Sequence, residues 1–170
     1  MVAGILMALA VPAVLSTMER SRGAAAARYL AGRMAALRGQ AVSRARNVAL
    51  RFDSAATGVR FAAYADGNGN GVRIADIDAG VDVLLEPAVT LSDWFPGVVF
   101  GESRATAGLD GVRLGGSTLL SFTPSGTSTS GSIYLLARDD SRWMVRVLGA
   151  TGRARVLRYD DTSGNWVPVL

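Results

Sequence analysis

The sequence predicts an α+β fold in which one long N-terminal helix packs on antiparallel β-sheets. Up to Asn47, apolar residues recur every three to four positions, which is typical of a helix with one buried face. After Asn47, apolar residues alternate with polar ones in short runs that Gly, Ser, Thr, Asp and Asn separate. We therefore expect a single helix from about residue 2 to about residue 46, followed by a β-domain.

The first 15 residues, MVAGILMALAVPAVL, contain no charged side chain. This run is shorter than the roughly 20 residues that a helix needs to span a bilayer core. No basic segment precedes it, as one would in a secretory signal peptide. We divide the chain accordingly: residues 1–20 form an apolar part of the helix that needs a membrane or a helix bundle around it, and residues 21–170 form the globular domain.

The second part of the helix is amphipathic and basic. Residues 1–52 contain eight Arg and one acid, whereas residues 53–170 contain ten Arg and 13 acids. These arginines either flank the apolar stripe as solvated side chains or, near Arg20 and Arg22, contact anionic lipid headgroups. The apolar stripe that we expect to cover a sheet consists of Ala27, Leu30, Met34, Leu37, Ala41, Ala45 and Val48.

Short strands account for most of the remaining chain. The segment 132–137 is apolar on both faces, so we expect it to be central in its sheet. The regular alternation of strands and turns indicates antiparallel sheets, for which a small β-sandwich is one arrangement. The predicted strands are 48–52, 58–64, 83–86, 97–101, 111–114, 118–123, 132–137, 143–149 and 153–159.

The composition argues against an enzyme. The chain contains no His, which removes the commonest general base and the commonest metal ligand, and no Cys, which removes disulfides and thiol chemistry. Neither a GxSxG elbow nor a P-loop is present. We expect a protein without catalytic residues and without a cofactor.

The stretch DGNGNG, which begins at Asp66, has two readings. As a calcium loop, it would use Asp66, Asn68 and Asn70 as ligands, but the twelfth position is Ile77, where such loops need an acid. As a turn, it needs only the two Asn-Gly pairs, which accept positive φ. We interpret the stretch as a turn and keep calcium as the alternative.

The stretch GRAR places two arginines close together. On a strand, Arg153 and Arg155 point to the same face about 7 Å apart, which suits two neighbouring phosphates. We expect Arg146 and Arg158 to lie close by. Either these side chains contact DNA, or they pair with acids, for which Asp139, Asp160 and Asp161 are the candidates. No aromatic residues interleave with these arginines in the sequence, as a single-strand binding site would require.

Four stretches in this order resemble the GspH/FimT branch of minor pseudopilins and minor type IV pilins. They are VPAVLSTMERSRGAAAARYLAGRMAALRGQAVSRARNVALRFD, DGNGNG, LSFTPSGTSTSGSIYL and TGRARV, and together they cover much of the chain. The resemblance implies a non-enzymatic subunit at or near the tip of a type II secretion pseudopilus or a type IV pilus. Prepilin peptidase would cleave its leader, and the new N-terminus would be methylated. A single-pass helix would hold it in the bacterial inner membrane with a periplasmic β-domain, and would join the helices of other pilins.

One part of the family pattern is absent. Members begin with a basic leader that ends in Gly, then a Phe-like residue, a Glu at the fifth mature position and about 20 apolar residues before the Pro that Pro12 matches. Here 11 residues precede Pro12, so we expect a prepilin-type protein with a truncated N-terminus. Two alternatives stay open: a competence-type minor pilin that binds DNA for uptake through its Gly-Arg-x-Arg motif, and an unrelated secreted or membrane-anchored β-domain. The sequence is compatible with secretion, pilus and competence systems alike.

Overall fold

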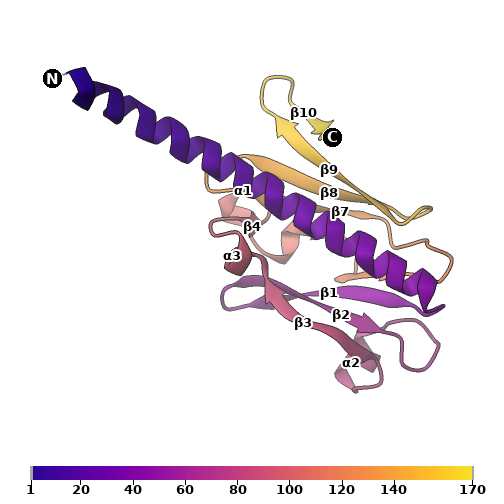
Figure 1. Ribbon diagram of the computed structural model, residues 1–170. Coiled ribbons are helices and arrows are strands. Elements are labelled where there is room, and N and C mark those ends of the chain that lie inside the picture. Colours follow the sequence, from indigo (N-terminus) through magenta and orange to yellow (C-terminus); the bar gives the residue numbers. More distant parts are fainter. Residues whose placement is uncertain (1, 170) are drawn as a thin grey trace.

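The protein consists of one long helix that lies across two antiparallel sheets (Figure 1). The computed structural model describes the backbone of residues 2–169 and the side chains of residues 21–169. The C-terminal half of helix α1 (Val2–Ser43) packs against the sheets, whereas its N-terminal half extends beyond them (Figure 1). The predicted α+β class is confirmed. No helix within the described residues combines the length and the apolarity that a membrane span needs.

Helix α1 ends three residues before the predicted boundary, in a Schellman motif built around Ala45. The Arg46 N–H donates to the Ala41 carbonyl at 3.1 Å, and the Ala45 N–H donates to the Val42 carbonyl at 3.3 Å. Ala45 has a φ of 50°, a conformation that usually requires Gly. Its inclusion in the buried stripe was therefore wrong, because Ala45 lies outside the helix and is exposed. Val48 of the predicted stripe is buried, but it lies on the strand that follows the helix.

The four-stranded sheet has the order β3-β2-β1-β6, and all of its pairs are antiparallel. Strand β3, at its edge, extends beyond the predicted segment and includes Pro87, which an edge strand tolerates because its N–H side need not pair. The strands of this sheet are β1 (Val48–Ala55), β2 (Gly58–Ala65), β3 (Val83–Thr90) and β6 (Leu119–Phe122).

The six-stranded sheet has the order β10-β9-β8-β7-β4, with β5 also paired to β7. Strand β7 lies inside this sheet, as the apolar character of segment 132–137 predicts. Strand β10 was not predicted, because Asn165–Pro168 is too short to show an alternating pattern. The strands are β4 (Val99–Phe100), β5 (Val112–Arg113), β7 (Gly131–Leu136), β8 (Arg142–Leu148), β9 (Arg153–Asp160) and β10 (Asn165–Pro168).

Four short helical segments connect the strands and were also not predicted. Helix α2 (Ile74–Asp78) follows the DGNGNG stretch, and helix α3 (Leu91–Trp94) follows β3. Two 3-10 turns, Arg104–Thr106 and Leu109–Gly111, lie between β4 and β5. Elements this short bury too few residues to leave a periodic signal in a sequence.

The core forms where α1 meets both sheets. Leu30, Met34 and Leu37 of the predicted stripe are fully buried, together with side chains from the two sheets such as Phe52 and Ile133. Gly23 allows α1 to approach the six-stranded sheet closely, because a Cβ at this position would lie 2.5 Å from Nε1 of Trp143. Arg33 of α1 pairs with Glu86 of β3, which ties the helix to the edge of the four-stranded sheet.

Candidate functional site

The GRAR stretch begins at a turn that α1 holds in place. Gly152, in the turn between β8 and β9, has a φ of 59°. A Cβ at Gly152 would lie 2.5 Å from the Gly126 carbonyl oxygen and 2.9 Å from Cδ of Arg38. Nε of Arg38 donates to that same carbonyl at 2.9 Å. Only glycine therefore fits at position 152, and the contact fixes the start of β9 against the helix.

Three of the four arginines that the sequence singled out share one surface. Arg146 on β8 lies directly opposite Arg155 on β9 in the antiparallel register, so their Cβ atoms are about 5 Å apart. Arg153 lies two residues before Arg155 on the same face, which faces away from α1. Arg158 has the opposite parity and faces Trp143 on the helix side of the sheet, so it is separated from the other three.

These three arginines, which we call the free arginine cluster (Arg146, Arg153 and Arg155), are exposed. Among the described residues, none of them forms an ion pair or a side-chain hydrogen bond. Like charges placed opposite each other across two strands repel. The arrangement therefore keeps an unneutralised positive patch at the end of the domain where α1 terminates, and such a patch attracts anions.

The acids that the sequence offered as partners are engaged elsewhere. Asp161 pairs with Arg142, and Asp139 accepts hydrogen bonds from Ser141. The Ser163 hydroxyl and the Thr162 N–H, together with the charge of Arg158, hold the pKa of Asp160 below its ordinary value. The described contacts thus do not include the acid pairing that we weighed for Arg153 and Arg155.

Aromatic side chains lie beside the free arginine cluster on the same sheet face. We call Tyr134, Tyr159 and Trp166 the aromatic cluster; Trp166 lies 5.6 Å from Tyr134 and 5.3 Å from Tyr159 between ring centroids. Because these residues come from three strands, their proximity has no signal in the sequence. Met144, on the same face and opposite both Tyr134 and Leu157, is buried. Met144 is buried because the rings of Tyr134 and Trp166 contact each other across β8 and β9 and cover it.

Two arginines cover rings of the aromatic cluster. The Arg142 guanidinium lies 3.7 Å from the Tyr159 centroid, and that of Arg113 lies 4.7 Å from the Tyr134 centroid. Both arginines also pair with acids, Arg142 with Asp161 and Arg113 with Glu102. A groove of about 450 Å³ lies between Arg113 and Arg146, and its lining also includes Ser130, Ser132 and Leu148.

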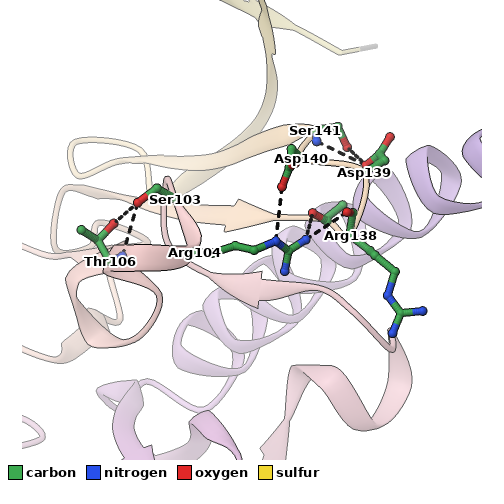
Figure 2. Close-up of polar contacts among 8 residues, drawn as sticks. Ser103, Arg104, Thr106, Arg138, Asp139, Asp140 and Ser141 are labelled. Atoms are coloured by element: carbon green, nitrogen blue, oxygen red, sulfur yellow. Dashed lines mark hydrogen bonds and ion pairs between the residues drawn. The ribbon is translucent and has the colours of Figure 1, made fainter.

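A second polar region lies where α1 leaves the sheets, at a cavity of about 720 Å³. Figure 2 shows Arg104 reaching from the β4–β5 loop to the turn between β7 and β8. Its guanidinium donates to the carbonyls of Ala137 and Arg138 at 3.0 Å and pairs with Asp140 at 3.3 Å. The side chain of Arg138 points away from these contacts (Figure 2). The contacts of Arg104 stabilise the turn between β7 and β8. We assign this cavity no ligand.

The DGNGNG stretch is organised around the Asp66 carboxylate, which is buried. It accepts hydrogen bonds from the N–H groups of Asn68, Gly69 and Gly71 and from the side chain of Asn47. Burial is the largest influence and raises the pKa of Asp66, but these hydrogen bonds together hold the pKa below its ordinary value.

This geometry bears on the calcium alternative. Both Asp66 oxygens accept N–H donors, so a cation at this carboxylate would have to displace them. No group of three or more ligating acids that could hold a metal occurs within the part of the chain that the structure describes. Calcium at Asp66, Asn68 and Asn70 stays a prediction from the sequence.

Comparison with known proteins gives two matches. A family model described as type II transport protein GspH matches residues 26–152, which is most of the chain. The fold is similar to that of the minor pseudopilin EpsH from the Type 2 Secretion System of Vibrio cholerae, with a TM-score of 0.53 and 15% sequence identity. That similarity covers 81% of this chain and 97% of the EpsH chain. A search of curated proteins gives no significant match.

Proposed function

Since the chain belongs to the GspH family of type II transport proteins, we propose that it is a minor pseudopilin, a non-enzymatic structural subunit of a type II secretion pseudopilus. The observation that carries this proposal is the division of α1. Its C-terminal half forms one core with both sheets, while its N-terminal half extends beyond them (Figure 1). A helix built this way connects a folded domain to surroundings that lie outside that domain.

We place the apolar part, residues 1–20, in the bacterial inner membrane before assembly and among the helices of other pseudopilins afterwards. The uncharged run at residues 1–15 supports this assignment. An apolar helix can leave lipid for a bundle of similar helices with little change in its surroundings. The β-domain then lies in the periplasm, at or near the pseudopilus tip. Processing of the full-length precursor by prepilin peptidase, followed by methylation, belongs to the same proposal.

Deletion of the gene in its source bacterium tests the proposal. Enzymes that the type II system exports should accumulate in the periplasm, and the complete gene should restore their secretion. A complementing variant with Met34→Asp, which places a charge in the core, should fail to restore it. Normal secretion in the deletion strain, with loss of pilus-dependent motility or of DNA uptake instead, would assign the protein to another pilus system.

The second candidate function is DNA contact by Arg153 and Arg155 with Arg146, as in a competence-type minor pilin. The free arginine cluster favours it, because three exposed guanidinium groups share a surface and have no described acidic partner. Arg158, which the sequence added to this set, lies on the other face of β9. It would not contribute to the same contact.

The salt dependence of DNA binding by the full chain in detergent tests this candidate. Replacing Arg153 and Arg155 with Gln should reduce the slope of log K against log salt by about two on duplex DNA. Arg28→Gln with Arg44→Gln is the matched control, since both side chains are exposed, Arg28 on α1 and Arg44 directly after its end, and Arg33 pairs with Glu86. If the control lowers the slope and the β9 variant leaves it unchanged, DNA contact at this site is ruled out.

A further inference from the structure

We propose that the outer face of the six-stranded sheet binds single-stranded DNA in preference to duplex, with bases on the aromatic cluster and phosphates on the free arginine cluster. The inference rests on the second candidate function and names the form of nucleic acid that this surface fits. It also identifies Trp166 as the principal stacking residue.

The two clusters form one continuous track. Along β9, residues 153, 155, 157 and 159 point to the same face, so the distance from Arg153 to Tyr159 is about 20 Å. Arg146 lies beside Arg155, and Trp166 lies beside Tyr159 in the register of the sheet. The groove of about 450 Å³ between Arg113 and Arg146 extends the cationic part of the track toward β7. A track of this length accommodates about three nucleotides of an extended strand.

The aromatic cluster is the feature that favours binding of single-stranded DNA over binding of duplex DNA. In a duplex, each base is stacked between its neighbours and only its edges are accessible in the grooves. Unpaired bases instead offer their faces, and a sheet that carries aromatic side chains beside cationic ones binds them by stacking. The aromatic cluster is partly exposed on just such a face. Along the strands, Tyr134 lies about 7 Å from the row that contains Arg146 and Arg155, and the row of Tyr159 and Trp166 lies about 13 Å from it.

Trp166 is the ring that can accept a base. Guanidinium groups lie over Tyr159 and Tyr134 and are themselves held by Asp161 and Glu102. Among the described residues, no cation lies over Trp166, and it contacts the two tyrosines edge-on or tilted. The two arginine–tyrosine pairs therefore orient Trp166, while its own ring is left for the ligand.

Fluorescence anisotropy of the full chain in detergent, with labelled dT oligomers and a duplex of equal length, tests the proposal. The wild type should bind the dT oligomer more tightly. Trp166→Ala should weaken dT binding about tenfold and leave duplex binding unchanged. Trp166→Phe should retain most of the affinity, which separates stacking from a folding defect. Trp94→Ala is the matched control, because Trp94 is the most exposed described tryptophan and lies on α3, outside this face.

The outcomes distinguish the preference for single-stranded DNA from DNA contact by the arginines. Equal affinity for single strand and duplex, or equal loss of both in Trp166→Ala, overturns the inference. If duplex binding then still depends on Arg153 and Arg155, the second candidate function survives that failure. If neither form of DNA binds, both are overturned, and the pseudopilin proposal is judged by the secretion assay alone.

Discussion

Among single residues, Asp66 and Ala45 have the clearest local effects. The Asp66 side chain holds a turn together, and the φ angle of Ala45 ends helix α1. Asp66 replaces solvent for the N–H groups of Asn68, Gly69 and Gly71 in a turn that Asp82 also holds through the N–H of Gly67. Ala45 terminates α1 in a conformation that costs an L-residue about 1–2 kcal/mol. Both positions therefore yield predictions about stability that do not depend on the function.

Replacing Asp66 with Asn should lower the free energy of unfolding at pH 7 by about 2 kcal/mol, because charge-assisted hydrogen bonds to buried N–H groups are lost. Since the folded-state pKa of Asp66 is lowered, its contribution is present above the ordinary carboxyl pKa and is lost as the pH falls through the folded value. Urea unfolding at pH 7 and at about pH 3 measures both effects. The variant should lose less stability between the two pH values than the wild type.

Asp93→Asn is the control for that measurement, because Asp93 is exposed and surface substitutions typically change stability by less than about 0.5 kcal/mol. An Asp66→Asn protein with the stability and pH dependence of this control would show that the carboxylate does not organise the turn.

Replacing Ala45 with Gly should raise the free energy of unfolding by about 1 kcal/mol. Glycine adopts the φ of 50° without the steric penalty that a Cβ imposes, and the Schellman hydrogen bonds stay in place. Thermal and urea unfolding measure the gain, with Ala35→Gly as the opposite control, because Ala35 lies in the exposed helix interior and should lose about 1 kcal/mol. A destabilised Ala45→Gly protein would contradict the helix end described above.

Among the secondary-structure elements, α1 contains three described glycines that differ in how closely other atoms pack around them. Gly23 faces Trp143 across a close helix–sheet contact, whereas no atoms outside the helix backbone lie within 4 Å of the Cβ positions of Gly32 and Gly39. Helix propensity alone treats the three alike and favours Ala at each. Tertiary packing distinguishes them.

Gly23→Ala should lower the free energy of unfolding by about 1–3 kcal/mol, because the added Cβ must displace the packed indole of Trp143. Gly32→Ala and Gly39→Ala should each raise it by about 0.5–1 kcal/mol. Urea unfolding of the three single variants gives the comparison. A stabilising Gly23→Ala would mean that α1 does not approach the six-stranded sheet as closely as described.

At the scale of the whole molecule, one helix holds two sheets together. The core that contains Leu30, Met34 and Leu37 includes Phe61 of the four-stranded sheet and Val145 of the six-stranded sheet. Arg38 adds a polar tie, since it contacts the turn after β6 and packs under the turn between β8 and β9. We infer that the sheets unfold together with the helix rather than one after the other.

Leu37→Ala should therefore lower the stability of the whole domain by about 2–4 kcal/mol in one cooperative transition. Tryptophan fluorescence, to which Trp143 of β8 contributes, and far-ultraviolet circular dichroism should report the same midpoint. Two separate transitions in the wild type or in the variant would show that the sheets are independent units.

The class of fold, the extent of α1 to within three residues and the family could be predicted from the sequence. These predictions follow from hydrophobic periodicity and from turn residues, which are patterns among residues that are close together in the sequence. It also identified DGNGNG as a turn and Arg153 with Arg155 as a same-face pair, because strand geometry fixes the positions of residues two apart. The early end of α1 escaped prediction because Ala, rather than Gly, occupies the left-handed position.

The residues that surround those arginines became known only from the folded arrangement of the strands. It placed Arg146 opposite Arg155, put Arg158 on the other face and brought Trp166 to Tyr134 over two intervening strands. The register of a sheet depends on contacts between strands far apart in the chain, and no local pattern carries that information. For the same reason, the absence of interleaved aromatic residues in the sequence was a misleading guide to the surface: the rings that lie beside the free arginine cluster come from β7, β9 and β10 and meet only when the sheet is formed.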